Sequence, residues 1–172
     1  MSKYLAKNKK PLTIREAIET DATAIRDIVN SIAAEKHYVV PERSREDWDE
    51  TIKDIKSNKG LIVVAQVNAN IVAIATLTRG RLEKNKHTAQ LGIIILKKFR
   101  RLGIGTAMMD YLIEWARKQE GLEKISLTVF STNKPAINLY QKFGFKIEGI
   151  SKKQYKIEGK YVDDIIMGKF LI

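Results

Sequence analysis

The sequence has no cysteine, and only three prolines and two histidines occur among its 172 residues. The missing cysteines exclude disulfides, thiolate metal sites and a cysteine nucleophile, and they are typical of a reducing compartment, so we expect a cytoplasmic protein without a metal cofactor. No apolar run approaches the roughly 20 residues of a membrane-spanning helix, and the basic first ten residues precede no apolar stretch. We therefore expect a soluble protein with no membrane partner, whose chemistry comes from other side chains.

Basic residues dominate, and the formal net charge is +11. Residues 15–59 are the exception, with 8 basic and 11 acidic side chains, whereas residues 60–172 hold 19 basic and 9 acidic ones. A cationic surface attracts nucleic acid, anionic lipid or a phosphorylated small molecule, and net charge alone does not choose among them. Length and a 44% hydrophobic content fit one globular domain, which we place at 11–172 after a flexible basic tail at 1–10.

Apolar periodicity predicts a single α/β domain without repeats or linkers. Strands are predicted at 12–17, 61–67, 71–78, 87–96, 125–129, 145–151 and 161–170. Helical spacing predicts helices at about 21–32, 44–55, 103–119 and 133–143, the second of which begins at Ser44. The resulting order, β-α-α-β-β-β-α-β-α-β-β, predicts a mixed sheet covered by helices.

The segment from 96 to 106, Leu-Lys-Lys-Phe-Arg-Arg-Leu-Gly-Ile-Gly-Thr, carries the clearest chemistry. A buried strand ends in a basic loop, and a helix begins there, so backbone N–H groups and the helix dipole favour an anion. The loop lacks the Gly-Lys-Ser/Thr of a Walker A motif, and Met108 stands where a dinucleotide fingerprint needs glycine or alanine. A basic turn whose glycines only shape the helix entry is the alternative.

Arg100-Arg-Leu-Gly103-Ile-Gly105 resembles motif A of the GCN5-related N-acetyltransferases (GNAT), Gln/Arg-x-x-Gly-x-Gly/Ala. The segment 133–145 is similar to a second element of that family, Asn-x-x-Ala-x-x-Leu-Tyr-x-x-x-Gly-Phe, and the two occur in the family's order. The resemblance covers roughly 12–171 and implies the acyl-CoA N-acyltransferase fold, a mostly antiparallel sheet flanked by helices. It further implies direct transfer of acetyl from acetyl-CoA to a primary amine in a ternary complex. The C-terminal part resembles small bacterial amino-acid or ribosomal-protein N-acetyltransferases.

The resemblance also assigns roles. Tyr140 is the candidate general acid toward the CoA thiolate, with a core tyrosine as the alternative. Asn133 bonds the pantetheine amide or caps its helix, or does both. The expected cofactor contacts are the backbone of Ile93, Ile94 and Ile95 for pantetheine, the amides of Arg101, Leu102, Gly103, Ile104, Gly105 and Thr106 for the pyrophosphate, and the side chains of Arg100 and Arg101 as countercharge.

A general base is harder to find in the sequence. Some family members place a glutamate on the strand before motif A, where this chain has Ala89. His87 shares the strand face of Ala89 and is the candidate base, with a surface histidine as the alternative, while Gln90 points to the other face. Ordered water is the remaining route for the proton.

The acceptor is expected to be a small-molecule or peptide amine. The acidic stretch at 15–59, with Glu35, Glu42, Glu46 and Asp47 near its centre, favours a cationic acceptor such as a polyamine or a lysine side chain, with a solvated helix face as the alternative. A nucleic-acid-binding module would need a basic helix face, which this sequence does not show, so that function is disfavoured. A non-catalytic acetyl-CoA-binding protein and a homodimer both stay open.

Overall fold

The computed structural model describes residues 2–6, 11–35 and 47–171. Two short 3-10 turns lie at Glu19–Asp21 and Lys97–Phe99. The strands and helices are β1 (Ser2–Leu5), β2 (Pro11–Glu16), α1 (Ala22–Ala33), α2 (Trp48–Ser57), β3 (Leu61–Val67), β4 (Asn70–Arg79), β5 (Thr88–Ile95), α3 (Ile104–Arg117), β6 (Lys124–Phe130), α4 (Lys134–Lys142), β7 (Lys146–Ile157) and β8 (Lys160–Phe170). From β2 onward the predicted order is confirmed, and β1 is an additional strand. The predicted helix start at Ser44 lies outside the described residues.

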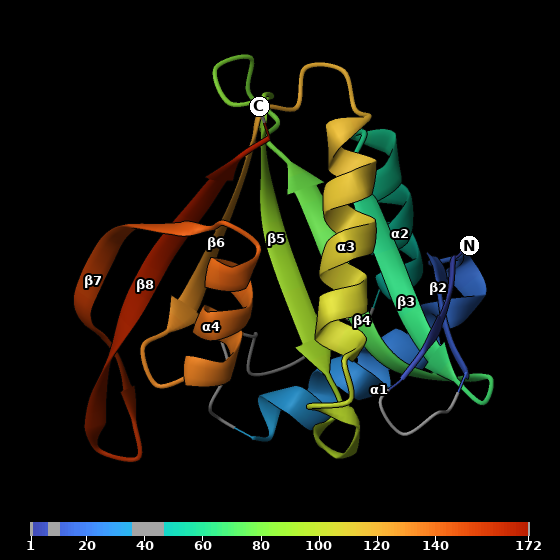
Figure 1. Cartoon of the computed structure of the whole chain (residues 1–172), viewed down its shortest axis with the longest axis horizontal. Coiled ribbons are helices and arrows are strands. Elements are labelled where there is room, and N and C mark those ends of the chain that lie inside the picture. Colours follow the sequence, from blue (N-terminus) through green and yellow to red (C-terminus); the bar gives the residue numbers. More distant parts are fainter. Residues whose placement is uncertain (1, 7–10, 36–46, 172) are drawn as a thin grey trace.

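All eight strands form one sheet in the order β1-β2-β3-β4-β5-β6-β8-β7 (Figure 1). Only β5 and β6 pair in parallel, and every other neighbouring pair is antiparallel. The expected mixed, mostly antiparallel fold is therefore confirmed. The N-terminal end differs from the expected flexible tail, because residues 2–5 pair with β2 as an edge strand and Tyr4 packs against the core.

Helices cover the two faces of the sheet in pairs. Helices α3 and α4 pack on one face, where Met108, Leu112 and Ile137 join a large core with alternate residues of the strands. Helices α1 and α2 pack on the other face, where Ile28 and Ile52 meet Ile62, Val64 and Ile74. No helix in the described part of the chain is both long and apolar enough to cross a membrane.

The parallel pairing of β5 and β6 is short. It joins Thr88 to Lys124, Ala89 to Ile125 and Gln90 to Ser126, and it ends there. Beyond Gln90, β5 stays paired with β4 as far as Ile95, and β6 stays paired with β8 as far as Phe130. The two strands therefore part within the sheet, and each keeps its other neighbour.

A buried ion pair attaches the start of α1 to β2. Asp21 accepts two hydrogen bonds from the Arg15 guanidinium, at 2.7 and 2.8 Å, and a third from the Ile18 amide at 2.8 Å. The pKa of the Asp21 carboxyl is lowered, mainly by the hydrogen bonds from Arg15. Because the folded state favours the charged form, this contribution to stability is present above the ordinary aspartate pKa and is lost as the pH falls through the lowered value.

We expect Asp21→Asn to reduce the free energy of unfolding by about 2 kcal/mol at pH 7, because Arg15 loses its charged partner in a largely buried place. The difference from the wild type should shrink below about pH 4, where the carboxyl of the unfolded chain is protonated. Urea denaturation at several pH values measures both effects. Asp27→Asn, at an exposed position of α1, is the matched control and should leave stability unchanged.

Candidate active site

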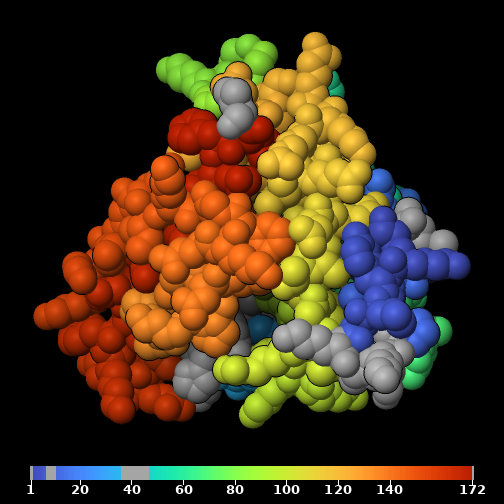
Figure 2. Space-filling model, viewed as in Figure 1, coloured from blue at the N-terminus to red at the C-terminus, as the bar shows by residue number. Residues whose placement is uncertain are grey.

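A cleft with a volume of about 580 Å³ opens where β5 and β6 part. The space-filling view shows the surface hollowed between α4 and the first turn of α3 (Figure 2). The residues that line the cleft come from α1, α2, β4, β5, β6 and α4, so the cleft reaches both faces of the sheet. The lining includes Val29, Trp48, Thr51, Asp54, Ile55, Ile74, Thr76, Thr78, Arg81, Gln90, Leu91, Gly92, Ile93, Ile94, Thr128, Val129, Phe130, Asn133 and Tyr140.

The open edge of β5 presents backbone groups to this cleft. The Leu96 amide donates to the Val72 carbonyl at 3.0 Å, which places the N–H groups of even-numbered residues on the β4 side. The N–H and C=O groups of Ile93 and Ile95 therefore face the gap toward β6. Ile93 and Ile94 line the cleft, and the Ile95 carbonyl accepts a hydrogen bond from Arg100 Nε at 2.9 Å. The Ile93 amide and carbonyl are thus placed to pair with an extended ligand.

The loop before α3 forms an anion-binding geometry. The Ala107 amide donates to the Gly103 carbonyl at 3.0 Å, and it is the first amide of α3 with a main-chain partner. Within the described residues, the amides of 101–106 donate to no main-chain carbonyl outside helices and strands. Arg101 and Gly103 adopt positive φ values of 61° and 85°. These left-handed residues turn the chain so that the amides gather at the helix N-terminus, where the dipole favours an anion.

Gly105 lies where the first turn of α3 packs closely against its neighbours. A Cβ on Gly105 would lie 3.1 Å from Leu139 Cδ2 and 3.4 Å from Ile95 Cδ1. Both atoms belong to the protein interior between α3, α4 and β5. A side chain here would press on Leu139 and Ile95, so Gly105 allows the close packing of the first turn of α3 against α4.

Arg100, which is expected to supply countercharge to an anion, forms an ion pair with Glu35. Its two terminal nitrogens donate to the Glu35 carboxylate at 2.8 and 2.6 Å, and the side chains retain only 24% and 20% of their exposure. Glu35 follows the end of α1, so the pair joins the loop before α3 to the helix on the other face of the sheet. The prediction that the acidic stretch attracts a cationic acceptor is weakened, because Glu35 has an arginine partner. Glu42 and Glu46 lie outside the described residues.

Tyr140 and Asn133 both line the cleft from α4 and its N-terminus. Tyr140 is 8% exposed, packs its ring against Phe145 with centroids 5.9 Å apart, and has its pKa raised to about 12 by burial. It therefore stays protonated across the neutral range. Asn133 Oδ1 accepts a hydrogen bond from the Ala136 amide at 3.3 Å, so the N-cap interpretation holds and its amide nitrogen stays available to a ligand.

The candidate base His87 is not placed in the cleft. Ala89, on the same face of the strand, is 1% exposed and lies in the core under α3. Gln90 points to the opposite face and lines the cleft, where its Oε1 accepts a hydrogen bond from Ser126 at 3.0 Å. Among the described lining residues of the cleft there is no histidine, so the geometry gives His87 no direct contact with a bound acceptor.

Sequence reasoning missed the charged rim of the cleft. Asp54 on α2 forms an ion pair with Arg81, which follows β4, and both line the cleft. Thr76 and Thr78 lie on β4 beside them, on the strand face that is turned to α2. Asp54 and Arg81 are 27 positions apart, so no local motif connects them.

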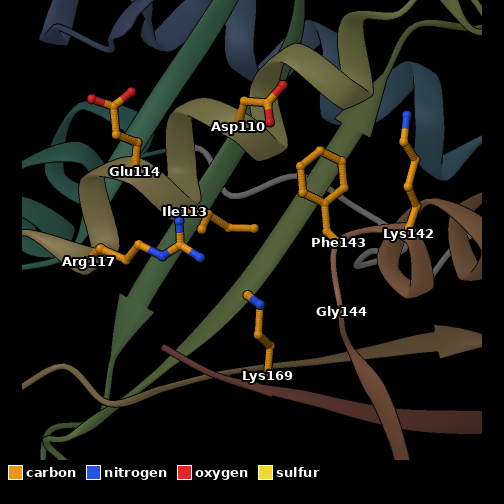
Figure 3. Close-up of a pocket in the computed structure, with 8 residues that line it drawn as sticks. All are labelled: Asp110, Ile113, Glu114, Arg117, Lys142, Phe143, Gly144 and Lys169. Atoms are coloured by element: carbon orange, nitrogen blue, oxygen red, sulfur yellow. The ribbon is translucent and has the colours of Figure 1, made fainter. Parts of the chain in front are cut away.

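A second groove, of about 510 Å³, lies between α3, α4 and the end of β8. Figure 3 shows Arg117 and Lys169 directed toward the same space beside Ile113, whereas Glu114 points away (Figure 3). The lining mixes acidic and basic side chains and contains none of the predicted site residues. The cleft between β5 and β6 is therefore the better candidate for the active site.

Comparison with known proteins shows what the whole chain is similar to. The sequence profile of the acetyltransferase (GNAT) family matches residues 23–145. The L-amino acid N-acetyltransferase AaaT of Escherichia coli is 33% identical over 159 residues, which are 92% of this chain and 97% of that protein. A GNAT-family acetyltransferase from Streptococcus pneumoniae has a crystal structure with a TM-score of 0.85 and 30% identity, covering 92% of this chain and 98% of that one. The acetyltransferase yncA of Salmonella typhimurium, solved with acetyl-CoA, has the same fold with a TM-score of 0.86 at 19% identity over 94% of each chain.

We expect Glu35→Gln to lower the free energy of unfolding by about 1–2 kcal/mol, because the partly buried Arg100 guanidinium loses its charged partner. Urea denaturation without ligand measures the loss. Glu114→Gln is the matched control, since Glu114 pairs with Lys118 on an exposed helix face and should leave the unfolding midpoint unchanged. Equal midpoints for Glu35→Gln and the wild type would contradict the structural role of the Arg100 pair.

Proposed function

The chain belongs to the acetyltransferase (GNAT) family, and from that premise we propose that the amine it acetylates is the α-amino group of a free amino acid. The chain is an acetyl-CoA-dependent N-acetyltransferase. What remains to be assigned is the role of each residue and the class of acceptor. The observation that carries the acceptor proposal is the Asp54–Arg81 pair at the rim of the cleft.

Acetyl-CoA is the acetyl donor, and its polar groups match what the cleft and the loop before α3 offer. A polyphosphate fits the free amides of 101–106 and the N-terminus of α3, and the amide-containing pantetheine arm fits the unpaired backbone of Ile93 and the side chain of Asn133. Arg101 supplies countercharge beside the loop. We assign Arg100 to fixing that loop through Glu35, with its Nε also satisfying the Ile95 carbonyl.

A free amino acid carries an ammonium and a carboxylate close together, and the rim of the cleft offers both countercharges. Arg81 can bind the carboxylate, and Asp54 can attract the ammonium. Both side chains are about half exposed, so a ligand can reach them, and exchanging their mutual pair for ligand contacts involves little loss. The E. coli relative is named as an L-amino acid N-acetyltransferase, which supports the same class of acceptor.

Tyr140 is proposed to donate a hydrogen bond to the sulfur that leaves as the thioester breaks. Its pKa of about 12 keeps the hydroxyl protonated, so it is always in the donating form at neutral pH. A thiol has a pKa of about 8.5, so the hydroxyl holds its proton more tightly than the thiolate does. The Tyr140 proton can therefore pass to sulfur only if the attacking nitrogen gives Tyr140 another proton in the same step.

We expect free L-amino acids to be acetylated with a kcat/KM about 10- to 100-fold higher than their carboxamides, because the amides lack the group that Arg81 binds. Release of free thiol from acetyl-CoA measures the reaction. Arg81→Gln should remove most of this discrimination, while Lys84→Gln, an exposed change in the same loop, should preserve it. Amides or short peptides that react as fast as free amino acids would contradict the proposed acceptor.

We expect Tyr140→Phe to lower kcat about 100-fold, at the lower end of general-acid effects, while the acetyl-CoA dissociation constant changes less than about twofold. Because the pKa of Tyr140 is about 12, the wild-type kcat should show no descending limb below pH 10. Tyr111→Phe, on α3 and not among the lining residues of the cleft, is the control. An unchanged kcat in Tyr140→Phe would assign Tyr140 to packing alone.

A further inference from the structure

Asp164 on β8 is a buried carboxylate without a partner. It and Asp21 are the two charged residues that the described part of the chain buries, each with 7% exposure. Asp21 is held by an arginine and an amide, whereas Asp164 Oδ1 is inaccessible to solvent and makes no hydrogen bond. A buried charged oxygen without a hydrogen bond destabilises the folded state, so the position calls for an explanation outside folding.

Strand pairing places this carboxylate beside the cleft. Asp164 pairs with Phe130 on β6 and with Ser151 on β7, and directly paired residues extend their side chains on the same face of a sheet. Phe130 lines the cleft, and so does Thr128, two residues earlier on the same face. Asp164 therefore lies one strand behind the wall of the cleft, on the face that α1 and α2 cover elsewhere.

The described neighbours of Asp164 on this face include no cation. The Phe130 ring packs against Tyr155 with centroids 4.8 Å apart, and Tyr155 pairs with Val162. The adjacent Asp163 belongs to the opposite face, where Lys152 Nζ and the Lys153 amide donate to it at 2.9 and 2.8 Å. Burial without a compensating charge raises the pKa of the Asp164 carboxyl, which makes it a better proton acceptor than an ordinary aspartate.

Amine acetylation needs a proton acceptor, and the described lining of the cleft offers few. An ammonium must lose one proton before its nitrogen can attack, yet Gln90, Thr76 and Thr78 do not accept protons near neutral pH. Asp54 at the rim already serves as an ion-pair partner, of Arg81 in the free protein and of the ammonium in the proposed complex. The unpaired carboxylate behind Phe130 is the remaining candidate on this side.

We propose that Asp164 accepts the proton released by the acceptor ammonium, reached from the cleft through water. The ammonium N–H bond breaks, its proton goes to the Asp164 carboxylate, and the lone pair left on nitrogen attacks the thioester carbonyl carbon. The C–S bond then breaks, the sulfur gains the proton of Tyr140, and the nitrogen returns one to Tyr140. Asp164 finally releases its proton to solvent. This rests on the proposed transfer to an amine but not on the acceptor being an amino acid.

Asp164→Asn tests this assignment, because it changes stability and activity in opposite directions. Removing an unpaired buried charge should raise the melting temperature at pH 7, and this gain should fade as the pH falls below the raised pKa of the carboxyl. The kcat/KM with an aliphatic amino acid at pH 7 should fall about 10- to 100-fold, within the range of general-base effects. In the pH profile of kcat/KM, the wild type should lose activity as the pH falls and Asp164 becomes protonated, and this acid limb should be absent from the variant. Asp163→Asn is the matched control and should keep kcat/KM and that limb.

An acceptor that is already neutral at pH 7, such as aminoacetonitrile, separates proton uptake from a structural role. With it, Asp164→Asn should react within about twofold of the wild type, whereas a distorted cleft would slow both acceptors alike. A shift of the melting temperature by acetyl-CoA verifies that the variant folds and binds. An equal loss with both amines, or none with either, would overturn the role of Asp164. Preference for peptides over amino acids would overturn only the proposed acceptor.

Discussion

Pairing between β5 and β6 stops after three residue pairs, and the site depends on this interruption. Each strand keeps an antiparallel partner on its other side, β4 for β5 and β8 for β6, so the sheet stays continuous while the twist of its two halves separates the strands. The inner edges then hold backbone groups without strand partners. An unpaired N–H or C=O that loses contact with water costs about 1–3 kcal/mol, so a ligand with amide groups is favoured there. Because main-chain groups do this work, the three isoleucines of β5 can serve the core with their side chains.

Ion pairs connect α1 and α2 to the strands of the sheet. Asp21, Glu35 and Asp54 come from the acidic stretch at 15–59, and their partners Arg15, Arg100 and Arg81 lie in or next to β2, β5 and β4. The acidity of this stretch therefore has a structural cause in addition to any role in recognition. The pairs also explain why the net charge of +11 is a poor guide to the anion site, since Arg100 is neutralised by Glu35. The unpaired amides before α3 are better placed than Arg100 to meet an anion.

Contiguous features of the site could be predicted from the sequence, and features that depend on pairing could not. The loop at 96–106 is one segment whose glycines and helix start are local, so its geometry follows from local rules. The side-chain partner of Arg100 is 65 positions away, and only the packing of α1 brings Glu35 to it. The alternation of side chains along a strand correctly placed Ala89 and Gln90 on opposite faces of the sheet. It could not tell which of the two faces would line the cleft. For the same reason His87 was the candidate base. Nothing local marked Asp164 as a buried carboxylate, because the neighbours of its strand are not given by the sequence.

The proposed proton transfers use two buried groups, Tyr140 in the lining of the cleft and Asp164 one strand behind it. Burial raises the pKa of Tyr140 and of Asp164 alike, but the consequences are opposite, because one group is needed in its protonated form and the other in its ionised form. A raised pKa secures the hydroxyl as a donor and makes the carboxylate a stronger acceptor, provided that the pH stays above its pKa. A hydrophobic setting therefore suits both roles without any further charged residue. The larger penalty falls on Asp164, since burying an unpaired carboxylate costs far more than burying a neutral hydroxyl.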